Sequence, residues 1–234
     1  MEPTGLIFAA LDCDADSIEE WNRWYDLEHT PMNVCLEGVM LSRRYVCTPD
    51  LYKSRIVEAG SPFDGDRATF LTTYVLSGDP QAAFDAMSVE LPKLYETGRM
   101  RFPAEKKTVR EGDIFVTEGA VGRPDLQLER RDVPFLYHHS LVLVQRRGAD
   151  DRAAKIAELD GVLGVWTSQS RSRPGVYLDL IFVEDDPARR AREIREAVPH
   201  TAEVVLDTPY ELINPLDYPW ADAIRNSDLP KTVS

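Results

Sequence analysis

Residues 18–45 read IEEWNRWYDLEHTPMNVCLEGVMLSRRY, and this stretch decides the fold because it joins a helix to a strand. Aspartates at 14–16 can cap a helix whose body spans 17–29. Pro31 is predicted to end that helix, since the residue before a proline avoids the helical conformation. Gly38 then opens a run, VMLSRRYVC at 39–47, whose alternation indicates a strand.

The pattern around this stretch predicts a complete β-α-β-β-α-β unit over residues 1–121. Its expected strands lie at 5–11, 39–47, 68–76 and 112–121, and its expected helices at 17–29 and 81–96. The polar, turn-rich residues 49–67 are predicted to form a long loop.

The same element order returns in the second half of the chain. After a charged linker at 122–136, strands are expected at 137–146, 164–170, 175–183 and 202–206, with helices at 150–159 and 187–198. The second unit would therefore span 137–207, and 208–234 would form a C-terminal coil anchored by Trp220.

The repeated order predicts an α+β fold of two ferredoxin-like βαββαβ units, formed by tandem duplication and closed into an antiparallel α/β barrel. Each unit covers one face of its sheet with helices and must bury the other, so two sheets are expected to face each other around a small apolar ligand space. Two halves of one chain or two copies of the chain could meet this need. The alternative is one such unit with an unrelated α/β appendage.

Composition narrows the classes of partner. The 234 residues include 27 basic and 40 acidic ones, and the net charge of −13 disfavours nucleic acid and acidic membrane surfaces. No run approaches the roughly 20 apolar residues of a membrane helix, and the N-terminus lacks the basic region of a signal peptide, so a soluble cytoplasmic protein is expected. Three cysteines in no metal-binding spacing are expected to be reduced thiols.

The first helix carries ionisable residues where a structural helix would place leucine or alanine. At about 100° per residue, one broad face collects Ile18, Trp21, Tyr25, Glu28 and His29. Asp26 precedes His29 by three positions and could orient its imidazole as a general acid or base. The alternative is structural, because the helix dipole alone favours a histidine near a C-terminus.

The remaining candidates lie on strands. Arg43 and Arg44 point to opposite faces, so at most one should face the site, and Arg44 is expected to hold an anionic or enolate oxygen. Substrate-binding roles are expected for a further set of residues: Trp24, Tyr25, Tyr74, Arg43 and His139. His138 and His139 are adjacent, so only one of them should face inward.

The motif W-x-x-W-Y-D-x-E-H-x-P followed by G-V-x-x-x-R-R-Y resembles the dimeric α/β-barrel superfamily, and within it the EthD-like proteins. The matching positions are Tyr25, Asp26, His29, Pro31, Gly38, Arg44 and Tyr45. The superfamily includes cofactor-free isomerases, polyketide cyclases and dehydratases, small monooxygenases and haem-binding members. The helix expected at 150–159 has no histidine or aromatic residue, so one site per chain is expected, in the first unit.

The resemblance implies a cofactor-independent enzyme that performs acid/base chemistry on a cyclic or polyketide-like small molecule, as an isomerase, dehydratase, cyclase or lyase. His29, Asp26 and Arg44 would be its catalytic residues. Neither a metal nor a cofactor is expected, because HExxH, Cys/His clusters and nucleotide-binding glycine motifs are missing from the sequence. A homodimer is consistent with the superfamily. The alternatives are a non-catalytic ligand-binding or stress protein of the same fold, and a haem- or oxygen-dependent oxidoreductase.

Overall fold

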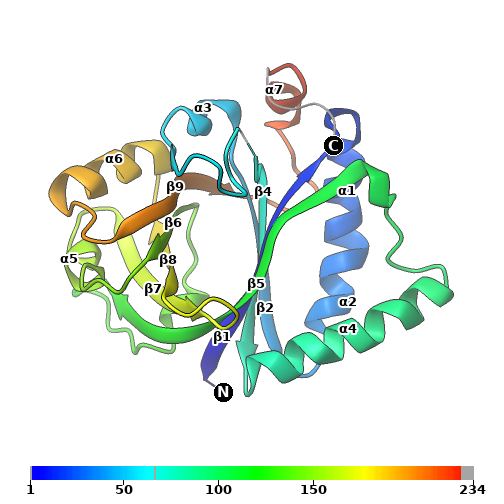
Figure 1. Cartoon of the computed structure of the whole chain (residues 1–234), viewed down its shortest axis with the longest axis horizontal. Helices are drawn as coiled ribbons and strands as arrows, with labels where there is room; N and C mark the ends of the chain where they lie inside the picture. The colour runs from blue at the N-terminus through cyan, green and yellow to red at the C-terminus, as the bar shows by residue number, and fades with distance from the viewer. Residues whose placement is uncertain (1, 66, 228–234) are drawn as a thin grey trace.

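The computed structural model describes residues 2–65 and 67–227, and nine strands form its single antiparallel sheet (Figure 1). The strands are β1 (Pro3–Cys13), β2 (Val39–Val46), β3 (Ile56–Val57), β4 (Phe70–Ser77), β5 (Lys107–Gly122), β6 (Ser140–Arg147), β7 (Val162–Ser170), β8 (Val176–Val183) and β9 (Glu203–Leu212). Their order is β2-β4-β1-β5-β7-β8-β6-β9-β3, and β2 also pairs with β9.

This order contains the ferredoxin-like arrangement twice. In β2-β4-β1-β5 and in β7-β8-β6-β9, the strands stand in the same sequence of second, third, first and fourth. The pairings of β5 with β7 and of β2 with β9 join the two units into a closed antiparallel barrel. The predicted fold class is confirmed, and the alternative of an unrelated appendage is wrong. One chain closes the barrel without a second copy.

Helices cover the outside of the barrel on two sides (Figure 1). The first unit carries η1 (Ala15–Ser17), α1 (Ile18–Trp24), η2 (Tyr25–His29), α2 (Thr30–Val34), α3 (Pro49–Tyr52), α4 (Pro80–Glu96) and η3 (Ala104–Lys106). The connection and the second unit carry η4 (Val133–Phe135), α5 (Ala153–Ala157) and α6 (Pro187–Ala197), and α7 (Ala221–Arg225) follows β9. None of the described helices is long and apolar enough to span a membrane.

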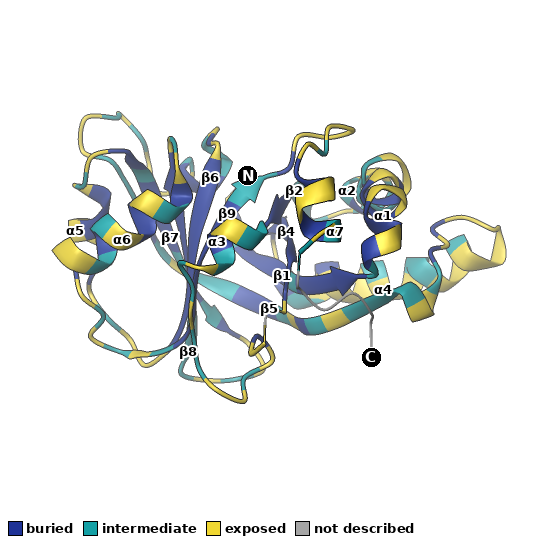
Figure 2. Cartoon of the chain, turned by 90° about the horizontal axis from the view of Figure 1, so that it is seen from above, coloured by how far each residue is buried: buried dark blue, intermediate teal, exposed yellow. Residues whose placement is uncertain are grey.

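The barrel interior is a packed core rather than the ligand space that the two facing sheets suggested. Inward-facing side chains from both units fill it, among them Leu6, Phe8, Phe115, Leu143, Trp166 and Phe182, all at most 1% exposed. Figure 2 shows the same distribution, with the strands mostly buried and the helices exposed on their outer sides. A ligand must therefore bind at a barrel mouth, at an opening between strands, or outside the sheet.

Pro31 does not end the first helix, contrary to the expectation. The chain widens into a π-helical turn at η2, where the Thr30 N–H donates to the carbonyl of Tyr25 five residues back, and the helix continues as α2. A wider turn accommodates a proline ring that would otherwise clash with the carbonyl of the preceding turn. The aromatic face of α1 thus reaches the outer surface of the sheet with η2 beside it.

Three further expectations are corrected. The predicted loop at 49–67 contains α3 and the short strand β3. The strand expected at 137–146 begins only at Ser140. The coil expected from residue 208 instead continues β9 to Leu212 and includes α7, while residues 228–234 of that coil lie outside the described residues.

Candidate ligand-binding site

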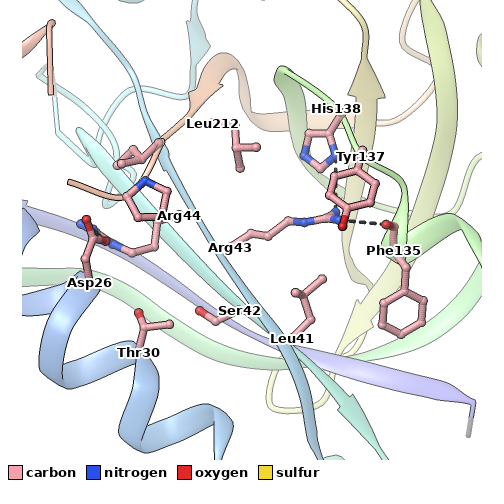
Figure 3. A pocket seen from close by; sticks show the side chains of 12 residues that line it. Asp26, Thr30, Leu41, Ser42, Arg43, Arg44, Phe135, Tyr137, His138 and Leu212 are labelled. Carbon is pink, nitrogen blue, oxygen red and sulfur yellow. Dashed lines mark hydrogen bonds and ion pairs between the residues drawn. The ribbon is translucent and has the colours of Figure 1, made fainter. Parts of the chain in front are cut away.

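A cavity of about 520 Å³ lies where β2 and β9 separate (Figure 3). The two strands pair only at Tyr45 with Leu212 and at Val46 with Glu211. The earlier part of β2 pairs with β4 on one edge, and its other edge faces an opening. The lining residues come from η2, α2, β2, η4 and the end of β9: Asp26, Thr30, Leu41, Ser42, Arg43, Arg44, Phe135, Tyr137, His138, Leu212, Ile213 and Pro215.

Arg43 and Arg44 both line this cavity, although they point to opposite faces of β2. Arg43 extends toward η4, and Arg44 extends toward Asp26 on η2 (Figure 3). The expectation that only one of them could face the site assumed a strand flanked on both sides. Because the cavity wraps around the open edge of β2, it takes in side chains from both of its faces.

Arg44 lies at the centre of a buried polar network. Its Nη1 donates to Asp26 Oδ1 at 2.9 Å, its Nη2 donates to Asn22 Oδ1 at 2.5 Å, and its guanidinium lies 4.2 Å from the ring centroid of Tyr25. Burial lowers the pKa of Arg44, while Tyr25 and Asp26 raise it. Its Nε is buried and has no partner among the described residues, so one donor of this guanidinium is unused.

Asp26 is held by the C-terminal segment and not by His29. Its Oδ2 accepts from the backbone N–H of Leu216 at 2.8 Å and from the Tyr218 hydroxyl at 2.5 Å, while Oδ1 accepts from Arg44. Oδ2 thus has two donors and Oδ1 has one, so three of the roughly four lone-pair positions of this carboxylate are used. The expectation that Asp26 orients His29 is wrong, because the η2 turn directs Asp26 toward β2.

His29 lies in an aromatic cluster on the outer side of the sheet. Its ring is 4.7 Å from that of Trp24 and 4.5 Å from that of Tyr25, and its Nδ1 is buried without a partner among the described residues. Burial, with Lys107 and Arg44 nearby, lowers the pKa of His29 to about 3, so the imidazole is neutral near pH 7. His29 does not line the cavity at β2, and a catalytic role for it stays a prediction.

The aromatic residues expected to shape the pocket lie behind it. Trp24 packs against Trp21 and Phe102. Tyr25 lies under the Arg44 guanidinium, and burial raises its pKa to about 12. Tyr74, on β4, is buried on the outer face of the sheet and accepts a hydrogen bond of 3.4 Å from Asn33 Nδ2. None of the three lines the cavity.

The two adjacent histidines divide between the interior and the surface. His138 packs between Tyr45 and Phe182, and its Nδ1 lies 2.8 Å from the carbonyl of Leu136. A carbonyl can only accept, so Nδ1 carries the proton and Nε2 accepts from the Tyr45 hydroxyl at 3.1 Å. Burial, with Arg43 beside it, lowers the pKa of His138 to about 4, so this imidazole is also neutral near pH 7.

His139, which the sequence favoured, is exposed and lines a neighbouring cavity of about 630 Å³. Strand alternation from Leu141 would turn His139 inward, but β6 begins only at Ser140, so the alternation does not reach it. His138 is thus the inward-facing histidine that the sequence did not favour. It also contributes to both cavities, together with Tyr137 and Leu212.

The connection between the units is the part of the site that sequence reasoning missed. Within it, Val133 is fully buried in the barrel core. Arg43 donates to the carbonyls of Pro134 at 3.2 Å and of Phe135 at 3.0 Å, which fixes η4 over the cavity. The apolar run VPFLY at 133–137 was the available signal, because an exposed linker has no reason to carry it.

The charge of the cavity is opposite to that of the whole chain. Its described lining carries two arginines and a single carboxylate, which is already paired with Arg44, in a chain whose net charge is −13. The rest of the lining is mainly leucine, isoleucine, proline and aromatic side chains, together with Thr30, Ser42 and the neutral His138. The arrangement suits a molecule with an apolar body and an anionic group, because the two guanidinium groups in the lining can donate to it, as can the hydroxyls of Thr30 and Ser42, which have no partner among the described residues.

No protein-family model matches the sequence, and no curated protein matches it. Solved structures do resemble the fold. A chlorite dismutase-like protein is 11% identical, with 95% of this chain and 99% of that chain covered and a TM-score of 0.53. A variant of Rhodococcus jostii RHA1 DypB in complex with heme is 7% identical, with 97% and 96% covered and a TM-score of 0.53. At such identities the likeness establishes the fold alone, and neither protein is described as a lyase or an isomerase.

Proposed function

We propose that the chain binds a small organic anion with an apolar body in the cavity at the open edge of β2. One observation carries the proposal: Arg43 and Arg44, from opposite faces of one strand, line the same apolar-walled cavity of about 520 Å³. The volume falls within the range of about 300–1,000 Å³ that is usual for ligand sites, and a few placed polar groups in an apolar wall are typical of them.

The proposal retains the substrate class expected from the resemblance, a ring-containing or polyketide-like molecule with an anionic or enolate oxygen. Arg44 Nε is the donor without a partner, so it is the group that would meet this oxygen. Arg43 would approach from the other side of the strand. We also propose that the chain is a member of the EthD-like group and that its two units span 1–121 and 137–207.

Acid/base catalysis needs a base that is not already engaged, and the carboxylate and the imidazole of the described lining are both engaged. Asp26 accepts from three donors and forms a buried ion pair with Arg44, and both nitrogens of His138 are hydrogen-bonded. The geometry therefore supports ligand binding more strongly than the isomerase, dehydratase, cyclase or lyase chemistry that we expected.

Fluorescence titration with anilinonaphthalene sulfonate, an apolar anion, tests this function. We expect saturable binding to the wild type and an affinity about tenfold lower for Arg43→Gln, which corresponds to one lost charge-assisted hydrogen bond. Arg131→Gln is the matched control, since Arg131 is a surface arginine paired with Glu129, and it should bind as the wild type does. The uncharged probe phenylnaphthylamine should bind more weakly. Equal affinities of Arg43→Gln and the wild type for the anion would refute the proposal.

A haem- or oxygen-dependent oxidoreductase is the second candidate, favoured by the fold shared with heme-bound DypB. The observation in this chain that fits it is the exposed imidazole of His139 on the cavity of about 630 Å³. His139 would hold the haem, and haem there would supply redox chemistry. Hemin titration followed by the Soret band tests the idea: a shifted, saturating band that His139→Ala abolishes supports it, and identical spectra for the two proteins exclude it.

A further inference from the structure

We infer that the chain has a second binding site, for a small organic ammonium ion, at the opposite end of β6 from His138. A cavity of about 300 Å³ lies there. Its lining comes from β5, β6, β8, β9 and the segments after β3 and β7, and it includes the charged residues Glu58, Glu111, Arg147 and Arg173. It shares no lining residue with the cavity at β2.

The cavity is the far mouth of the barrel. Glu111 is opposite Ala10 in the β1–β5 register, and Ala10 belongs to the barrel core, so Glu111 also points inward. Gln145 alternates with Leu143 and Leu141 on β6 and faces the same interior. Ser140, at the start of β6, and Gln145 are separated by roughly 17 Å along the strand at about 3.3 Å per residue, and His138 lies just before Ser140.

Glu111 carries the inference because half of its carboxylate is unused. Its residue is only 8% exposed. Oε1 accepts from Gln145 Nε2 at 2.5 Å and from Arg173 Nη2 at 2.6 Å. Oε2 is buried and has no partner among the described residues. A buried carboxylate oxygen without a donor is costly, so this position calls for a ligand that brings one.

The charges around the cavity specify a cationic ligand. Arg173 is shared by Glu111 and Asp113, at 2.6 and 3.0 Å, and Arg147 is shared by Glu58 and Glu203, at 2.8 and 2.9 Å. The lining itself holds two carboxylates and two guanidinium groups, but Asp113 and Glu203 lie just behind it and share the same two arginines, so four carboxylates surround two guanidinium groups. An ammonium group supplies both the missing charge and the N–H donors that Glu111 Oε2 lacks.

The rest of the lining points to an organic cation rather than a metal ion. In the part of the chain that the structure describes, no group of three or more His, Cys, Asp or Glu side chains could hold a metal ion. Pro62, Val176 and Val205 provide apolar wall beside the carboxylates, which suits a short methylene chain. A diamine or an alkylamine therefore matches the site better than a hydrated ion.

Isothermal titration calorimetry with the four-carbon diamine putrescine tests the inference on the full chain. We expect saturable binding with one site, and an affinity at least tenfold lower for Glu111→Gln, an isosteric change that removes the charge. Tetramethylammonium, which has the charge but no N–H, should compete poorly. Sodium chloride at matched ionic strength corrects for nonspecific screening.

Two further variants keep the outcome decisive. Glu58→Gln, at the rim of the cavity, should also weaken putrescine binding. If the Glu111→Gln variant does not fold, the Glu58→Gln variant serves as the test in its place. Arg43→Gln should bind putrescine as the wild type does, which separates this site from the proposed anion site. Absence of saturable binding, or equal affinities for the wild type and the folded carboxylate variant, would overturn the inference and leave water as the partner of Glu111.

Discussion

Replacing Asp26 by asparagine should destabilise the folded chain by about 3 kcal/mol, because removing one member of a buried ion pair typically costs 3–5 kcal/mol. The side chains of Asp26 and Arg44 are each only 6% exposed, so water cannot solvate the Arg44 cation once its partner charge is removed. Asparagine keeps one acceptor oxygen but places an amide N–H₂ among three donors, those of Arg44, Leu216 and Tyr218. The lower end of the range applies, since Asn22 and the Tyr25 ring still stabilise the Arg44 cation.

Urea unfolding with a fixed m-value measures this change, and two further variants separate the charge from the packing. Tyr218→Phe removes one donor to Asp26 and should cost about 1 kcal/mol, the usual net contribution of a hydrogen bond. The double variant Asp26→Asn/Arg44→Met removes both charges and should lose clearly less than the sum of the two single variants. A loss below 1 kcal/mol for Asp26→Asn, or strict additivity in the double variant, would refute a desolvated ion pair at this position.

Three other properties follow from the structure. Burial lowers the pKa of His138 from about 6.5, the usual value of a histidine, to about 4. The unfolded chain therefore takes up a proton that the folded chain resists, and stability should fall as the pH drops from about 6.5 to 4. Urea unfolding at several pH values should show His138→Gln reducing that slope by up to about 1.4 kcal/mol per pH unit, and an unchanged slope would mean that His138 is not protected. Gly38 and Gly60 both have positive φ, +85° and +77°, but a Cβ added at Gly38 would lie 3.2 Å from the Cβ of Ala83, whereas one added at Gly60 would meet open space. Thermal unfolding should therefore show Gly38→Ala as more destabilised than Gly60→Ala. The reverse order would contradict the packing of α4 on the turn at Gly38. Leu143→Ala should cost about 2–5 kcal/mol in urea unfolding, since Leu143 is fully buried in the barrel core, and a smaller loss would indicate a loosely packed interior.

The fold could be predicted from the sequence because local patterns and topology agree. Strand runs rich in β-branched and aromatic residues, such as 175–183, are readable one by one, and two successive units of the same order can bury their open sheet faces against each other. What the sequence could not supply was the end of β2. Nothing in the run at 39–47 indicates that β9 pairs with Tyr45 and Val46 only, and this partial pairing creates the cavity.

The site was predicted in part from the sequence, and each error in that prediction has a local structural cause. Asp26 and Arg44 were singled out and do meet, but helix spacing paired Asp26 with His29 because a regular α-helix was assumed through the π-helical turn. The partners Leu216 and Tyr218 are about 190 residues away in the sequence, so no local pattern could reveal them. His138 was missed because the strand starts one residue after His139.

The most direct test of the proposed anion site observes the two arginines themselves. In protein labelled with ¹⁵N-arginine, the Nε–Hε signals of Arg43 and Arg44 can be assigned with Arg43→Gln and Arg44→Lys and followed during titration with anilinonaphthalene sulfonate. We predict that both signals shift along one saturation curve, with the larger change at Arg44, whose Nε has no partner among the described residues. If both signals stay fixed while those of surface arginines such as Arg131 move, the anion binds elsewhere and the proposed site is wrong.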